Sequence, residues 1–110
     1  MVSYSPSGLV KQVEMQINSV LRRTDWAEIN DKGRRAVDEL RQSLIDAKIY
    51  ATDYELSEMR DEQEDNAKKA RKYLSLARRQ ILRASEFDVF SAIDVAHLTA
   101  QIDQAKADLK

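Results

Sequence analysis

The chain has no cysteine, one proline and only two glycines among its 110 residues. Without cysteine it cannot form a disulfide, a thiolate metal site or a thiol nucleophile. Glycine and proline are too scarce for an all-β fold, which needs turn residues every few positions, and for a glycine-rich loop that binds phosphate. A hydrophobic fraction of 43% beside a charged fraction of 34% predicts a folded, all-α chain.

Strong net charge, long apolar runs and a leader-like segment are also lacking. The net charge is −1, so the chain as a whole exerts no strong field on nucleic acid or membranes. The apolar runs are too short to span a membrane. Segment 1–6 lacks the features of a signal peptide, so we expect a cytoplasmic protein. The length predicts one domain over residues 1–110, with residues 1–6 as a flexible N-terminus.

The pattern of apolar residues predicts three or four helices. They are expected to form a bundle or an antiparallel helical hairpin with one long spine helix. Coiled-coil-like packing of the helices is compatible with both. The first helix is expected to start with Ser7 as its cap and to end near Arg23. One face of it carries Leu9, Val10, Val13, Ile17, Val20 and Leu21.

A second helix is expected to start at Asp25, because Glu28 three residues later completes a variant of the capping box. Its apolar seam alternates spacings of three and four and consists of Trp26, Ile29, Gly33, Ala36, Leu40, Leu44, Ala47, Ala51 and Tyr54. Such a seam is typical of a long helix packed against a partner. We expect this helix to run through Gly33. The alternative is a turn at residues 30–33, with the helix starting near Asp31.

The middle of this helix has a second apolar stripe on nearly the opposite side. It consists of Ile45, Ile49, Thr52, Leu56 and Met59. A helix that is apolar on two faces has neighbours on two sides. This stretch is therefore predicted to lie at the centre of the bundle, or to be shared between the core and a dimer interface.

Residues 60–66 contain no apolar side chain, and two structures fit them. A break there gives a helical hairpin. One helix could also pass straight through, because a rhythm of three and four continues from Leu56 to Ala77. Beyond this segment we expect an amphipathic helix over residues 67–84, a connection at 85–90, and a last helix capped by Ser91 and Asp94.

Charges divide into two neighbouring blocks. Residues 53–65 hold seven acids and one base, and residues 66–85 hold seven bases and no acid. In a hairpin the acidic arm would lie beside the basic arm of the same chain. In a rod, two antiparallel chains would pair each block with the partner's opposite block across a two-fold axis. Such surface pairs would set orientation, while the apolar seam would supply the stability.

No catalytic, cofactor or metal residues are predicted. The only histidine, His97, lies outside any Glu-x-x-His pair, and the carboxylates at 58–65 lack the glycine and glutamate of a calcium loop. We expect a non-enzymatic interaction protein that binds another protein or, above all, a second copy of itself as a dimer. The predicted core or interface residues are Leu44, Ile45, Ile49, Leu56, Met59, Tyr73 and Ile81.

The alternative function is nucleic-acid binding by the basic helix 67–84. Its candidate anion-binding residues are Lys68, Lys69, Lys72, Arg79 and Arg83. Binding of this kind rests on contacts between cations and phosphates and weakens steeply with salt.

Overall fold

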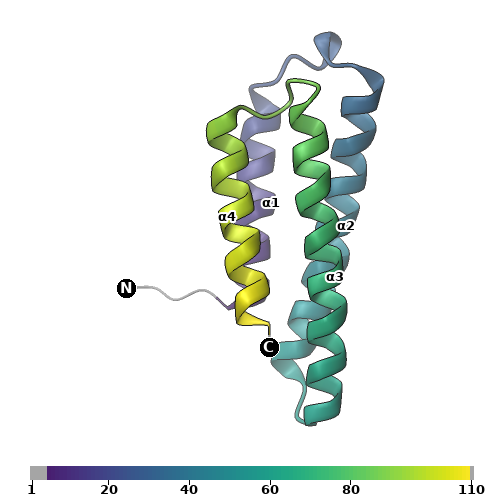
Figure 1. Cartoon of the computed structure of the whole chain (residues 1–110), viewed down its shortest axis with the longest axis vertical. Helices are drawn as coiled ribbons and strands as arrows, with labels where there is room; N and C mark the ends of the chain where they lie inside the picture. The colour runs from purple at the N-terminus through teal and green to yellow at the C-terminus, as the bar shows by residue number, and fades with distance from the viewer. Residues whose placement is uncertain (1–4, 110) are drawn as a thin grey trace.

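The computed structural model describes residues 5–109, and this part of the chain folds into helices without any strand (Figure 1). The predicted all-α fold class is confirmed. In chain order the elements are α1 (Pro6–Arg22), the short 3-10 helix η1 (Trp26–Glu28), α2 (Asp31–Leu56), α3 (Arg60–Ser85) and α4 (Ala92–Asp108). Residues 1–4 of the predicted N-terminal tail lie outside the described residues, whereas Pro6 already belongs to α1.

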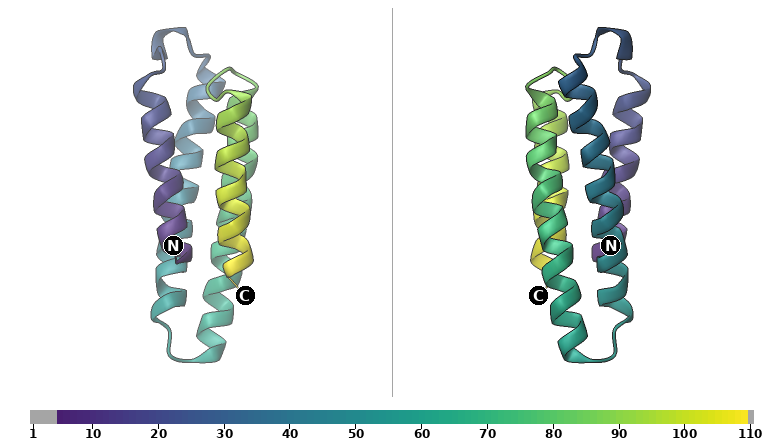
Figure 2. Two further views of the ribbon diagram at one scale, coloured as in Figure 1. Left: turned by 90° about the vertical axis from the view of Figure 1, so that its left-hand side faces the viewer. Right: turned by 90° about the vertical axis from the view of Figure 1, so that its right-hand side faces the viewer.

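The helices form an antiparallel bundle in which neighbours along the chain lie side by side. α2 packs against α1 and α3, and α4 packs against α3 and α1. α2 and α3 have 26 residues each, whereas α1 and α4 have 17. The hairpin of α2 and α3 therefore projects beyond the ends of the shorter pair (Figure 2). The sequence predicts one long spine helix, but the structure has two long helices of equal length, α2 and α3.

The chain reverses direction between α2 and α3, at residues 57–59. This confirms the hairpin and excludes a continuous rod. The turn comes earlier than predicted, because residues 60–66 form the first turns of α3 instead of a loop. Asp61 and Glu62 lie in the first turn of α3, where acidic side chains interact favourably with the positive end of the helix dipole.

Polar side chains hold this turn together around Ser57. Its hydroxyl donates to the carbonyl of Asp53 at 2.6 Å and accepts from the amide of Asn66 at 3.2 Å. The side chain of Gln63 donates to the carbonyl of Ser57 at 3.0 Å. Ser57 thus satisfies a carbonyl in the last turn of α2, and Gln63 and Asn66 of α3 bind Ser57 in turn.

α1 begins earlier than the sequence pattern suggests. Ser5, not Ser7, is the cap, since its side chain accepts from the backbone N–H of Gly8 at 3.2 Å and Pro6 fills the first turn. Ser7 instead donates from its backbone and its hydroxyl to the carboxylate of Glu55, at 2.9 and 2.7 Å. This contact ties the start of α1 to the last turn of α2.

The connection between α1 and α2 corrects the expectation that a helix runs from Asp25 through Gly33. Asp25 caps only η1, where its carboxylate accepts from the N–H of Ala27 at 3.1 Å. A second, separate cap follows at Asn30, whose side chain accepts from the N–H of Lys32 at 2.8 Å. α2 therefore starts at Asp31, the alternative start.

One apolar core runs through the bundle. Where α2 meets α3 the buried residues are largely alanines, namely Ala36, Ala47, Ala51, Ala67, Ala70, Ala77 and Ala84. Small side chains let two helices approach closely. Larger side chains complete the core, among them Val13, Ile17, Leu40, Leu44, Leu74, Ile81, Leu98 and Ile102. From Gly33 to Ala51 the seam predicted for the middle helix is confirmed as its core-facing side, whereas Trp26 and Ile29 lie before α2.

The connection between α3 and α4 is a Schellman motif followed by a capping box. The N–H of Val89 donates to the carbonyl of Ala84, and the N–H of Asp88 to that of Ser85. Asp88 has a φ of 62°, in the left-handed region that this motif requires and that glycine usually occupies. The predicted cap at Ser91 is confirmed, with Asp94 completing a reciprocal capping box.

Gly33 gives a direct test of how closely the start of α2 approaches the connection between α3 and α4. A Cβ at position 33 would lie 2.9 Å from the Cβ of Phe87 and 3.1 Å from Cγ2 of Ile29. Gly33→Ala should therefore lower the free energy of unfolding by about 1–3 kcal/mol through overpacking, although alanine is the better helix former. Chemical denaturation measures the change.

The control for this substitution removes the crowding atom. In a Phe87→Gly background the same Gly33→Ala change should cost clearly less stability. A stabilising effect of Gly33→Ala in the wild-type background would show that the two segments lie further apart than described.

Candidate interaction surface

The lower half of α2 presents an apolar stripe on the side that faces away from the core. Ile45, Ile49, Thr52 and Leu56 follow one another at spacings of four, three and four, which places them on one helix face. Met59, in the turn after α2, is the next exposed apolar residue along the chain. We call these five residues the outer α2 stripe. The exposed fractions of its large apolar members are 49% for Ile45, 51% for Ile49, 74% for Leu56 and 62% for Met59.

The other residues predicted as core or interface lie inside the molecule. Leu44 and Ile81 are buried in the bundle core and are not available to a partner. Tyr73 is half-buried and stacks on Tyr50 with ring centroids 5.7 Å apart. The two tyrosines join α3 to α2 within the chain. The structure therefore divides the predicted set into core residues and the exposed outer α2 stripe.

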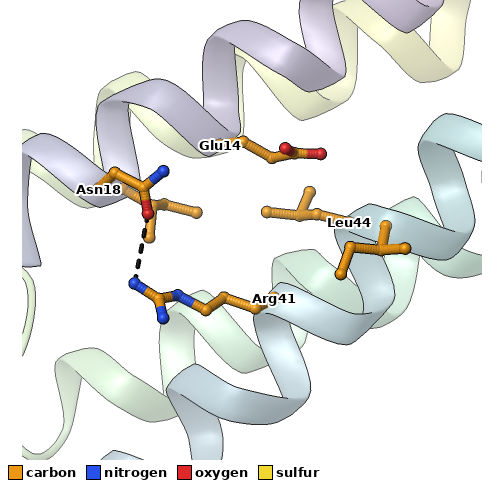
Figure 3. A pocket seen from close by; sticks show the side chains of 6 residues that line it. Glu14, Asn18, Arg41 and Leu44 are labelled. Carbon is orange, nitrogen blue, oxygen red and sulfur yellow. Dashed lines mark hydrogen bonds between the residues drawn. The ribbon is translucent and has the colours of Figure 1, made fainter.

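A small crevice lies beside the stripe, between α1 and α2, with a volume of about 150 Å³. Its apolar lining includes Leu44 and Ile45, so the crevice adjoins the first residue of the stripe. Arg41 reaches across from α2 and donates to the side-chain oxygen of Asn18 on α1 at 3.3 Å (Figure 3). Glu14 completes the polar rim and forms a 3.8 Å ion pair with Lys48.

The acidic and basic blocks do not pair across the hairpin. The acids at residues 53–65 occupy the hairpin tip, because α2 ends and α3 begins within this block. Their ion pairs, within the described residues, join Arg60 to Glu64 and Lys69 to Asp65, both along α3 itself. The expected pairing of an acidic arm with a basic arm is therefore wrong for this hairpin.

Four of the five candidate anion-binding residues form a straight line on the outer face of α3. Lys68, Lys72, Arg79 and Arg83 are all exposed and lie on one helix face, spread over about 22 Å. We call them the basic α3 stripe. Within residues 5–109 none of the four forms an ion pair.

The fifth candidate, Lys69, is exposed but contacts other residues of the hairpin. Its ammonium group is 3.0 Å from the Asp65 carboxylate and lies 5.4 Å from the ring centroid of Tyr50. The hydrogen bond and the charge of Asp65 raise the pKa of Lys69 above its ordinary value. Lys69 is thus less free to bind an external anion than the basic α3 stripe.

Two further bases of the block, which the predicted anion-binding set leaves out, fasten α3 to α4. Arg78 is 3.2 Å from the carboxylate of Asp103, and Arg71 donates to the backbone carbonyl of Leu109. Both bases are half-buried. Their position on α3, which is closer to the core than the exposed line of cations, is the sequence signal that separates them from the basic α3 stripe.

The chain matches no protein-family model, no curated protein and no solved structure.

Two observations on the described residues concern other kinds of site. No three histidine, aspartate or glutamate side chains within residues 5–109 come together as metal ligands. No helix in this part of the chain is long and apolar enough to cross a membrane. His97 is exposed on α4. The outer α2 stripe and the basic α3 stripe are therefore the surface features from which a function can be argued.

Leu44 and Ile49 test the division between core and surface. Leu44→Ala should cost about 2–5 kcal/mol of unfolding free energy, since it opens a cavity in the core. Ile49→Ala should cost less than about 1 kcal/mol, because half of that side chain is already in water. Both are measured by denaturation at the highest dilution that the signal allows. Equal losses for the two variants would contradict the described orientation of α2.

Proposed function

We propose that this chain is a non-enzymatic helical protein–protein interaction module, an adaptor, regulator or assembly factor, that self-associates through the outer α2 stripe. The observation that carries the proposal is the exposure of Ile45, Ile49 and Leu56 on one face of α2, with the exposed Met59 in the turn that follows. Such faces, bordered by polar residues, are typical of protein interaction sites. Location in the cytoplasm remains a prediction from the sequence.

The physical gain comes from removing these side chains from water. Full burial of an isoleucine, leucine or methionine side chain is worth about 1.5–3 kcal/mol, and much of that remains unrealised while the stripe is exposed. α2 is already a helix held by its core side, so binding needs little further ordering of the backbone. The crevice beside Ile45 adds a place for a partner's side chain at the edge of the stripe.

Self-association can be tested by light scattering after gel filtration. At about 100 μM we expect a mass above the 12.6 kDa of one chain, with dimer the favoured species. The double variant Ile45→Glu and Ile49→Glu should be monomeric, because it places charges on the apolar face.

The matched control changes an exposed isoleucine elsewhere. Ile93 on α4 is 71% exposed, and Ile93→Glu should leave the association unchanged. A wild-type chain that elutes as a compact monomer over the whole concentration range would refute self-association.

The basic α3 stripe supports a second candidate function, contact with the phosphate backbone of a nucleic acid. Its four cations are exposed and have no acidic partner within the described residues. Their spread of about 22 Å matches several successive phosphates of a duplex. Self-association of α2 and phosphate contact by α3 would use different faces of the bundle.

Salt dependence separates this candidate from the first. If the stripe binds duplex DNA or RNA, binding at about 50 mM salt should weaken steeply towards 200 mM. Lys72→Glu with Arg79→Glu should abolish it. Arg22→Glu with Arg23→Glu, which changes as many exposed bases at the end of α1, should have a smaller effect. No binding at low salt, or binding that ignores salt, removes this candidate.

A further inference from the structure

The outer α2 stripe has the spacing of a coiled-coil seam. In the seven-residue repeat abcdefg, Ile45 and Thr52 occupy d positions, and Ile49 and Leu56 occupy a positions. Polar residues stand at the preceding seam positions, so the apolar seam is confined to the lower half of α2. A seam of this type buries itself most completely against another helix with the same repeat.

Charges of opposite sign stand on the two sides of this seam. Arg41 and Lys48 occupy g positions on the side of α1, and we call them the flanking cations. The third g residue, Glu55, accepts hydrogen bonds from Ser7. Asp46 and Asp53 occupy e positions on the side of α3, and we call them the flanking acids. In coiled coils the e and g residues determine which partner is chosen and how it is oriented.

From this arrangement we infer that two copies of the chain pack α2 against α2 in parallel, about a two-fold axis that runs along the helices. The inference rests on the proposed self-association and specifies its geometry. In a parallel pair each g residue faces the e residue five positions later on the partner. Arg41 then faces the partner's Asp46, and Lys48 faces the partner's Asp53. The two-fold axis repeats both contacts, so four attractive pairs result.

The antiparallel arrangement with the same seam lacks this advantage. It brings e residues against e residues and g residues against g residues. With Ile49 against the partner's Thr52, Asp46 faces the partner's Asp53, which is repulsive. Lys48 faces the partner's Glu55, which is attractive, so the two kinds of contact offset each other. Charge complementarity therefore selects the parallel orientation.

The charged residues needed for these contacts are accessible. Arg41, Lys48 and Asp53 are exposed and Asp46 is half-exposed. Their contacts within the chain are long, 3.8 Å from Lys48 to Glu14 and 3.3 Å from Arg41 to Asn18. An isolated helix with so short a seam would gain little, but here the bundle core already holds α2 in place.

The absence of cysteine makes disulfide trapping a clean test of orientation. In the parallel pair, equivalent seam residues lie close enough for a disulfide, so Ile45→Cys and Leu56→Cys should each form dimers when oxidised alone. In the antiparallel pair, equivalent residues at these positions lie about 17 Å apart along the axis. Neither variant would then cross-link alone, and only their mixture would.

The control for trapping is Ala100→Cys, on the exposed side of α4. It should form far less dimer under the same oxidation. Cross-linking of the mixture alone overturns the parallel orientation. Equal cross-linking of Ala100→Cys overturns the assignment of the interface to α2.

A charge exchange tests the flanking pairs independently. Asp46→Lys with Asp53→Lys makes both sides of the seam positive, and Arg41→Glu with Lys48→Glu makes both sides negative. Each double variant alone should self-associate at least about tenfold more weakly than the wild type. Mixed in equal amounts, the two should form a heterodimer, because every pair is then attractive again.

These experiments distinguish failure of the parallel pairing from failure of self-association itself. A monomeric wild type overturns both. A wild-type dimer whose association ignores the charge exchange, while Ile45→Glu with Ile49→Glu still abolishes it, overturns the parallel pairing and leaves self-association intact. Circular dichroism of each variant confirms that it remains helical, since all four charged positions lie on the surface of the bundle.

Discussion

The close antiparallel contact between α2 and α3 determines the rest of the structure. Alanines on both helices, such as Ala47 and Ala77, are fully buried and allow this approach, while the hydrogen bond between Ser43 and Gln80 at 2.9 Å joins the two helices midway. The hairpin then offers one apolar side, which α1 and α4 cover over part of its length. Because these helices are shorter by nine residues, the hairpin projects beyond them.

This construction explains why the molecule keeps apolar side chains in water. The core uses one face of α2, so Ile45 and Ile49 on the opposite face stay about half exposed. The basic α3 stripe lies on the outer face of the adjacent helix, whereas Arg71 and Arg78 of the same helix bind the C-terminal helix region through Leu109 and Asp103. One hairpin thus carries two chemically distinct surfaces, and the proposed self-association through α2 would leave the cations of α3 accessible.

Much of this fold follows from the sequence because helix periodicity is local. The two stripes of the middle helix, the cap at Ser91 and the all-α class all come from patterns within a few turns. The turn at residues 57–59 was misplaced because it contains neither glycine nor proline, and its stability depends on side chains such as Gln63 that lie beyond it. Which stripe faces the core also depends on contacts distant in sequence. The separation of Lys69 from the basic α3 stripe, for example, requires the position of Tyr50.

The central claim is that the chain self-associates through the outer α2 stripe. Backbone amide NMR spectra recorded over a series of protein concentrations test it most directly, because each residue reports separately. The account predicts concentration-dependent shifts concentrated in residues 41–59 and small changes in α4. Spectra that do not change with concentration, or changes centred on the outer face of α3 or α4, would contradict it.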